Sequence, residues 1–392
     1  MKKLLQIVVF AIVLFPVCAY ATESESQTNE MLHSSAEYYG DFFEKGLQTI
    51  DGSQGFEVLF PKENPKDVLL KLIHGELEFS VASLMQSIGR LLFQEIYDGI
   101  KLLVFILTLS ILSSYLTGLQ ESFGKEGVGM VAFYVCYIVI AGIASAGFYQ
   151  TAECVGQAVE QISLFMKMVV PVVITTLITC GAIVSATVFE PVIISIVEIA
   201  VSLIQGVMLP LVMVSAGMNI VNHLSDRFKT QKLVKFMNQC IKWGLSVMLT
   251  VFVSVAGLQS IASGSADALT LKLSKFATSN LIPVVGGILA ETVETVMNCS
   301  VLIKNSVGIL GILCLIALAA FPLLKVGGML ILFRLTAAFC EPVSDSKIVV
   351  CLSELANAIS VLFSILAAVT VMFIIVLTIV LNAGNTALML GR

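Results

Sequence analysis

Three ionisable side chains interrupt an apolar stretch in the C-terminal half of this sequence. Glu291 and Glu294 stand three residues apart, and Lys304 follows ten residues later. On a helix, a spacing of three places both carboxylates on one face. Lys304 would lie about three turns further along, so an ion pair would need a bend near Asn298. A charge at the bilayer centre costs about 2.5–3.5 kcal/mol on insertion scales, so such groups usually face a bundle interior or an aqueous cavity.

Two further acids, Glu190 and Glu198, stand among apolar residues about 100 positions earlier. We treat all five charges as candidates for a conduction or coupling pathway. Two other interpretations stay open. Glu291 and Glu294 can lie in an interfacial turn solvated by headgroup water, or the charges can form a structural ion pair.

The usual motifs of catalysis and nucleotide binding are absent from the sequence. It contains no HExxH and no GxxxxGK[ST] loop. The nine cysteines form no CxxC pair, and the three histidines are far apart. We therefore predict no catalytic residue, no metal site and no cofactor, and any energy for transport must come from another protein.

The composition is that of an integral membrane protein. Hydrophobic residues make up 57% and charged residues 12% of the 392 positions, with a mean hydropathy of +0.97. Soluble domains average about 45–50% apolar and about 25% charged residues. Residues 22–98 hold 14 acids and 5 bases, whereas residues 99–392 hold 13 acids and 15 bases. No basic tract resembles a nucleic-acid footprint.

The first 21 residues are typical of a secretory signal peptide. Lys2 and Lys3 precede an apolar run, and the Ala-Tyr-Ala at 19–21 predicts cleavage before Thr22; an uncleaved anchor is the alternative. A cleaved signal and an uncleaved anchor both place the acidic segment 22–98 outside the cytoplasm, because the lysines stay inside. Within it, residues 67–98 have the apolar spacing of an amphipathic helix, or of two helices joined near Gly75. This segment can lie on the membrane, dock on a partner or pack on its own neighbours.

The number of spans depends on one basic stretch. The positive-inside rule places 222–242 in the cytoplasm. Because the chain is outside the cytoplasm at residue 98, an odd number of spans must precede this stretch. Four apolar segments precede it, at 100–119, 128–149, 166–188 and 191–217, so the parity is wrong. One solution makes 166–188 and 279–297 re-entrant. This predicts an all-α polytopic protein with about six full spans and two re-entrant segments; the alternative is eight spans with 222–242 outside. The helix-break candidates are Pro171, Pro283, Gly286 and Gly287, and the basic residues are Arg227, Lys229, Lys232, Lys235 and Lys242.

Two parts of the membrane region resemble each other. MVVPVVITTLIT (168–179) matches NLIPVVGGILAE (280–291) at an offset of 112 residues, and LPLVMV (209–214) meets FPLLKV (321–326) in the same register. We therefore predict an internal duplication, about 145–258 and 257–372. Such repeats are frequent in transporters and channels, with the pathway at the repeat interface.

The layout resembles the stage III sporulation protein AE family of endospore-forming bacteria. The stretch that carries the resemblance is LIPVVGGILAETVETVMNCSVLIKNSVGILG (281–311). The resemblance implies a role after engulfment, in the mother-cell membrane that faces the forespore. It also implies partners: other stage III sporulation membrane proteins, ring-forming proteins and an ATPase in trans. It supplies no established site residues.

Three functions are open on this sequence. The first is a membrane subunit of a multi-protein trans-envelope channel, the second a self-sufficient secondary transporter for a small solute, and the third a non-conducting assembly scaffold. Vesicle uptake by the isolated chain separates the second from the first. Replacing Glu291, Glu294 and Lys304 by apolar residues separates the third.

Overall fold

The structure is a computed structural model that describes residues 27–50, 53–60, 63–76, 81–123, 126–224, 230–281 and 286–391. Every regular element in these ranges is a helix. Three short helices come first: α2 (Gln27–Thr49), α3 (Ser53–Leu59) and α4 (Pro65–His74). Long helices follow: α5 (Val81–Phe123), α6 (Glu126–Thr179), α7 (Ile183–Leu203), the π-helix η1 (Ile204–Met208), α8 (Leu209–Leu224), α9 (Gln231–Leu281), α10 (Gly286–Cys340) and α11 (Ser346–Gly391).

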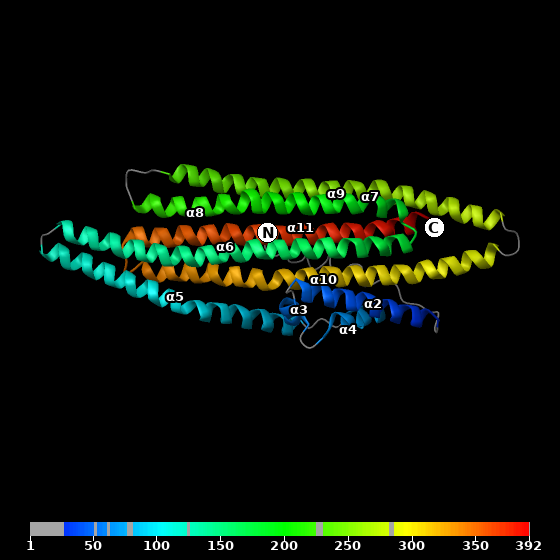
Figure 1. Cartoon of the computed structure of the whole chain (residues 1–392), viewed down its shortest axis with the longest axis horizontal. Helices are drawn as coiled ribbons and strands as arrows, with labels where there is room; N and C mark the ends of the chain where they lie inside the picture. The colour runs from blue at the N-terminus through cyan, green and yellow to red at the C-terminus, as the bar shows by residue number, and fades with distance from the viewer. Residues whose placement is uncertain are drawn as a thin grey trace.

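Six antiparallel rods form the body of the molecule. They are α5, α6, the continuous rod α7–η1–α8, α9, α10 and α11 (Figure 1). Each of the six contains a segment long and apolar enough to cross a membrane, which confirms the predicted helical membrane fold and its count of about six spans. The rods are longer than a bilayer requires: α6 has 54 residues, or about 80 Å at 1.5 Å per residue, against a hydrocarbon core of about 30 Å.

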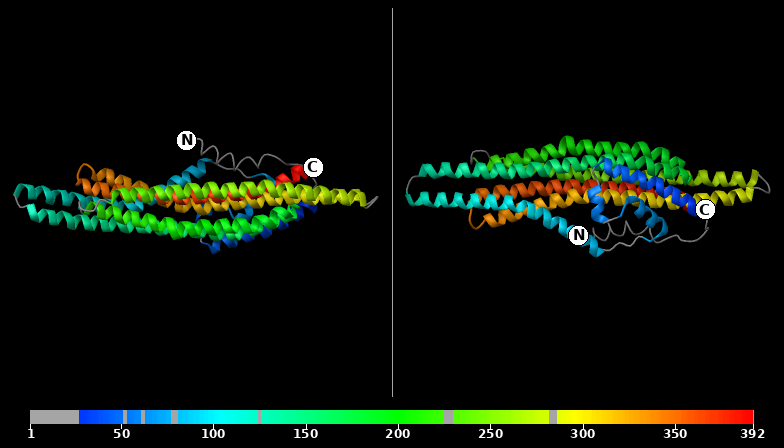
Figure 2. Two further views of the ribbon diagram at one scale, coloured as in Figure 1. Left: turned by 90° about the horizontal axis from the view of Figure 1, so that it is seen from above. Right: turned by 60° about the horizontal axis from the view of Figure 1, so that its bottom comes forward.

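The last rod occupies the centre of the bundle. α11 packs on α6, α8, α9 and α10, and the right view of Figure 2 shows it between the other rods. Most of its apolar side chains are buried, whereas a stripe that includes Ser353, Asn357 and Ser364 stays partly exposed along one side. Ile359, Leu366 and Phe373 are fully buried members of the resulting core.

The three N-terminal helices pack as a small layer against α10. α2 and α4 pack on each other, and α3 and α4 both contact α10. Pro65 lies in the first turn of α4, where its missing N–H costs nothing, and Gly75 ends that helix with φ 70°. Phe43, Leu47 and Phe56 form the buried side of this layer. The predicted helix over 67–98 is thus two helices that Gly75 separates, in part docked on the chain's own rods.

The structure places the chain reversals differently from the re-entrant prediction. Segments 128–149 and 166–179 belong to one helix, because Pro171 lies inside α6 and the helix continues to Thr179. The reversal comes at 180–182, where Gly181 adopts φ 80°. Pro171 is therefore not a helix break: a proline removes one backbone hydrogen bond, and packing on both sides preserves the helix. Three rods, not four segments, precede the basic stretch, so the parity problem disappears.

The structure describes only part of the second predicted re-entrant segment, 279–297. Pro283 lies outside the described residues, and Gly286 and Gly287 are the first two residues of α10. α8 ends and α9 begins at the same end of the bundle at which α10 ends and α11 begins (Figure 1), as a repeat of the same orientation requires. The reversal at 180–182 in the first copy has no counterpart in the second. Adding the offset of 112 residues gives 292–294, which lies inside α10. The duplication stays a prediction.

Candidate functional site

Among the predicted charges whose side chains the structure describes, Lys304 is the one that lies in the core. It is fully buried in α10, and its Nζ donates a hydrogen bond to the carbonyl oxygen of Leu381 on α11 at 2.9 Å. Gly308 lies one turn further along α10 and faces the same leucine, which a Cβ at that glycine would overlap. A lysine whose ammonium bonds a helix carbonyl links the two central rods of the bundle.

Asp267 is a second buried ionisable residue, which the sequence reasoning missed. It lies on α9 with no exposed surface. Its Oδ1 accepts the N–H of Val184 at 2.7 Å, and its Oδ2 accepts the N–H of Ser185 at 2.9 Å. These are orphan donors in the first turn of α7, where a carboxylate is favoured by hydrogen bonding and by the helix dipole. Asp267 therefore fixes the reversal at 180–182 to α9.

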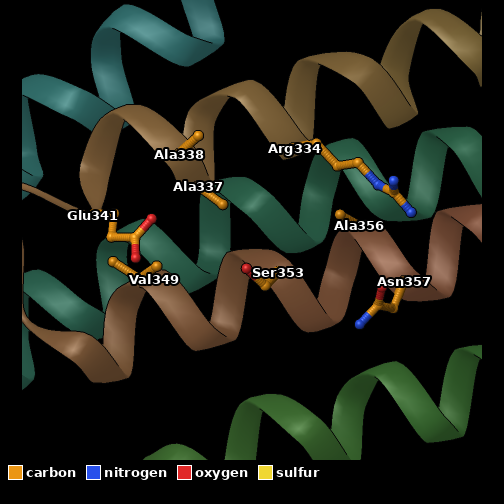
Figure 3. Close-up of a pocket in the computed structure, with 8 residues that line it drawn as sticks. All are labelled: Arg334, Ala337, Ala338, Glu341, Val349, Ser353, Ala356 and Asn357. Atoms are coloured by element: carbon orange, nitrogen blue, oxygen red, sulfur yellow. The ribbon is translucent and has the colours of Figure 1, made fainter.

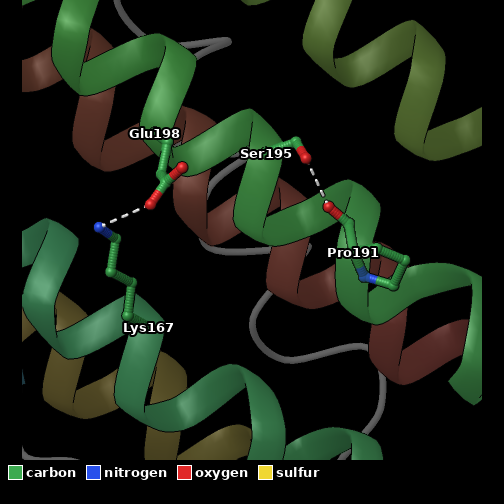
Figure 4. Close-up of polar contacts among 4 residues, drawn as sticks. All are labelled: Lys167, Pro191, Ser195 and Glu198. Atoms are coloured by element: carbon green, nitrogen blue, oxygen red, sulfur yellow. Dashed lines mark hydrogen bonds and ion pairs between the residues drawn. The ribbon is translucent and has the colours of Figure 1, made fainter.

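Glu198 and Lys167 form an ion pair on the outer surface. The Lys167 Nζ on α6 lies 3.2 Å from Glu198 Oε1 on α7, and both side chains are partly exposed. Figure 4 shows the two side chains pointing toward each other across the α6–α7 contact. One turn before Glu198, the hydroxyl of Ser195 donates to the carbonyl oxygen of Pro191 at 2.7 Å. The structure thus gives Glu198 a partner that the sequence reasoning did not name.

The other predicted acids are separate from this pair. Glu190 lies on the exposed side of α7, two turns before Glu198. Glu291 and Glu294 lie in the first turns of α10, and their side chains fall outside the described residues. The five candidate charges therefore do not converge on one point among the residues that the structure describes.

Three polar contacts join four rods near the other end of the bundle. Asn219 on α8 donates to Glu354 Oε2 on α11 at 3.2 Å, and Ser215 donates to Asn238 Oδ1 on α9 at 3.2 Å. Buried Tyr137 on α6 donates to the Ile220 carbonyl oxygen at 2.9 Å. Such interhelical bonds position rods that share an apolar environment.

A small open pocket lies between α10 and α11 at the same end. Its volume is about 230 Å³, and both signs of charge line it through Arg334 and Glu341. Figure 3 shows Arg334 on α10 and Glu341 just after the end of that helix, beside Ser353 and Asn357 on α11. Charged and amide groups at the rim of a membrane bundle can bind a polar headgroup or a partner side chain.

The basic stretch lies at this end too. Lys232, Lys235 and Lys242 are exposed on the first three turns of α9. Arg227 and Lys229 lie outside the described residues. Within the described parts of the chain, no three His, Cys, Asp or Glu side chains form a group able to hold a metal ion.

The signals for the missed residues are weak in the sequence. Asp267 follows a run of small residues and stands alone, 83 positions from the backbone it caps. Lys167 sits between two methionines in an apolar run. A lone charge in such a run marks a residue that needs a partner, but its partner comes from another rod and becomes visible only in the fold.

Two comparisons with known proteins identify the same family. The profile of the family described as "Stage III sporulation protein AE (spore_III_AE)" matches residues 63–384. The chain is 30% identical over 378 residues to "Stage III sporulation protein AE" of Bacillus subtilis (strain 168), covering 95% of this chain and 93% of that protein. No solved structure matches.

Proposed function

Because this chain belongs to the stage III sporulation protein AE family, and so has a role in sporulation, we propose that it is a membrane subunit of a multi-protein trans-envelope channel. This complex would serve endospore development after engulfment. The observation that carries the proposal is the extent of the family match, which covers 63–384 and reaches all six rods. The six candidate spans support a multi-pass membrane location.

The proposal places the subunit in the mother-cell membrane that faces the forespore, with 22–98 between the two membranes. The docked layer α2–α4 supports this placement, because its outer surface is polar. Glu37 and Lys66 form an exposed ion pair at 2.7 Å there, and Asp41 and Lys45 are exposed nearby. Partners from the intermembrane side, among them the ring-forming proteins, would meet this surface. The ATPase in trans would act from the mother-cell side.

Deletion of the gene tests the sporulation role directly. The expected result is normal engulfment followed by loss of late forespore reporter expression and of heat-resistant spores. Complementation with the full chain should restore both. A deletion strain with normal late forespore expression and a normal spore count would refute the proposal.

A channel subunit and a non-conducting scaffold differ in their need for the charges. The test is a variant in which Glu291, Glu294 and Lys304 are replaced by Leu, Leu and Met. A conducting role predicts a loss of forespore expression while the chain stays in the membrane at its normal amount. Full sporulation by a stably present variant would favour the scaffold.

The burial of Lys304 favours a second candidate function, that of a self-sufficient secondary transporter. A fully buried ammonium in the bundle core is the kind of group that substrate and proton pathways use. Reconstitution of the purified chain in vesicles separates the two functions. Solute uptake driven by a gradient, without any partner, would favour the transporter over the channel subunit.

A further inference from the structure

A polar strip runs along the outer surface of α6. Glu153, Gln157, Glu160 and Lys167 are all exposed, and their spacing of four, three and seven residues keeps them on one helical face. Leu164 is the one large apolar side chain exposed between them. The strip therefore presents two acids, an amide and an ammonium over about 20 Å.

The neighbouring rod widens this surface. Glu198 on α7 pairs with Lys167 at 3.2 Å, and exposed Gln205 in η1 donates to the Gly156 carbonyl oxygen at 3.4 Å. Glu190 is exposed further along α7. We call this surface the α6–α7 face, defined by Glu153, Gln157, Glu160, Lys167, Glu190, Glu198 and Gln205.

Contacts with α9 show which part of α9 lies at the same position along the bundle axis as this face, which is what depth means below. Gln259 on α9 donates to the Val188 carbonyl oxygen at 3.0 Å, and a Cβ at Gly244 would lie 3.2 Å from the methyl carbon of Met208. Residues 244–259 of α9 therefore run beside 188–208. That range contains the α7 and η1 members of the α6–α7 face.

At this same depth, α9 presents a surface that suits lipid. No charged residue occurs from 243 to 266. Large apolar side chains are exposed there at regular intervals: Trp243, Val247, Val251, Val255 and Leu258. One side of the bundle is thus compatible with acyl chains where the α6–α7 face is not.

The N-terminal layer gives independent evidence for water at this depth. A Cβ at Gly46 of α2 would overlap the Met168 side chain of α6, and Phe43 lies 3.7 Å from a Cβ placed at Gly311. Met168 directly follows the last residue of the strip. α2 therefore lies beside the α6–α7 face, and its exposed Asp41 and Lys45 need an aqueous surrounding.

Lipid and a protein partner each fit the α6–α7 face poorly. A single charge at the bilayer centre costs about 2.5–3.5 kcal/mol on insertion scales, and the face exposes four glutamates and one lysine. The buried core of a protein interface is depleted of charged residues and enriched in aromatic ones, and no aromatic side chain is exposed on α6 from 153 to 167 or on α7 and η1. We propose that the α6–α7 face is the wall of a water-filled pathway that reaches membrane depth beside α2. This inference deepens the proposed function and rests on it for what the pathway carries.

Thiol labelling of sealed membrane vesicles tests the wall. The nine native cysteines are replaced by Ser or Ala, and single cysteines are placed at Gln157 and Glu160 on the face. Val251→Cys and Val255→Cys on α9 are the controls, because they lie on the apolar side within the range 244–259 that runs beside 188–208. Lys45→Cys on α2 is the water-exposed reference. The probe is a membrane-impermeant maleimide added to right-side-out and inverted vesicles.

The expected result is labelling of Q157C and E160C at least tenfold faster than labelling of V251C and V255C, from the side on which K45C reacts. Equal rates on both sides of the bundle would overturn the proposal. So would face cysteines that react in membranes of the chain expressed alone but are protected in sporulating cells, since a partner protein would then cover the face.

A second comparison covers the case in which the cysteine-free chain does not fold. In the native chain, Glu160→Leu should leave the amount of membrane-inserted protein unchanged, and Val251→Glu should lower it severalfold. The opposite order would overturn the proposal. The labelling of vesicles from the chain expressed alone and the comparison of inserted amounts need no spore formation, so their failure is distinguishable from a deletion strain that sporulates normally.

Discussion

The buried carboxylate of Asp267 allows a quantitative test of how the α6–α7 reversal is held. Asp267→Ala would leave the amide groups of Val184 and Ser185, which it binds at 2.7 and 2.9 Å, without acceptors. An unsatisfied buried donor costs about 1–3 kcal/mol, and release of a buried charge offsets part of the sum. We therefore expect a loss of about 2–4 kcal/mol, and about half of that for Asp267→Asn, which keeps one acceptor.

The assay is thermal unfolding of the purified chain in detergent at a fixed heating rate. The fraction of protein that stays monodisperse is measured at each temperature. A change of 1 kcal/mol corresponds to about 2 °C for a chain of this size, so Asp267→Ala should lower the midpoint by about 4–8 °C. The matched control is Asp345→Ala. Asp345 accepts the N–H of Lys347 at 2.8 Å at the start of α11 but is exposed, so its loss should cost about 1 kcal/mol. Equal shifts for the two variants would refute the reasoning that burial and the double acceptor matter.

Other predictions concern the core, the docked layer and its ion pair. Lys304→Ala should cost about 2–5 kcal/mol by opening a cavity, whereas Lys304→Met should cost less than about 1.5 kcal/mol; equal losses in thermal unfolding would contradict this. Gly55→Ala should expose the N-terminal layer to limited proteolysis, because a Cβ there would overlap the α10 backbone, while exposed Gly142→Ala should have no such effect. The ammonium of Lys66 lowers the pKa of Glu37, so the pair contributes above the ordinary glutamate pKa, and its contribution is lost as the pH falls through the lowered value. Glu37→Gln should remove this acid dependence of proteolysis, and persistence of the same dependence would refute the assignment.

The class of fold follows from composition, whereas the division into rods does not. Apolar segments of about 20 residues are visible in the sequence, and they predict helices in a membrane. Polar residues between 150 and 161 separate two such segments, yet both belong to α6. A sequence window reads that interval as a loop, because it cannot know that most of its polar side chains are exposed on one side of a helix whose other side buries Val155 and Val159. Pro171 misleads in the same way, since neighbouring rods preserve a helix that an isolated chain would break.

The candidate charges were identifiable as residue types but not as partners. Lys304 stands out in an apolar run, and burial in α10 is consistent with that signal. Its contact with Leu381 joins residues 77 positions apart, and the bond from Val184 to Asp267 spans 83. Pairs of this kind depend on which rods are neighbours. The sequence alone constrains that only through connection lengths.

The central position of α11 has a consequence for biosynthesis. The ribosome makes this rod last, yet α6, α8, α9 and α10 all pack on it. At about 5–20 residues per second, roughly 10–30 s pass between completion of α6 and emergence of α11. During that time the earlier rods can pack on one another but lack the rod that four of these helices share. A chain truncated before 346 should therefore be a substrate for membrane proteases and accumulate poorly, even though five of its six rods are complete.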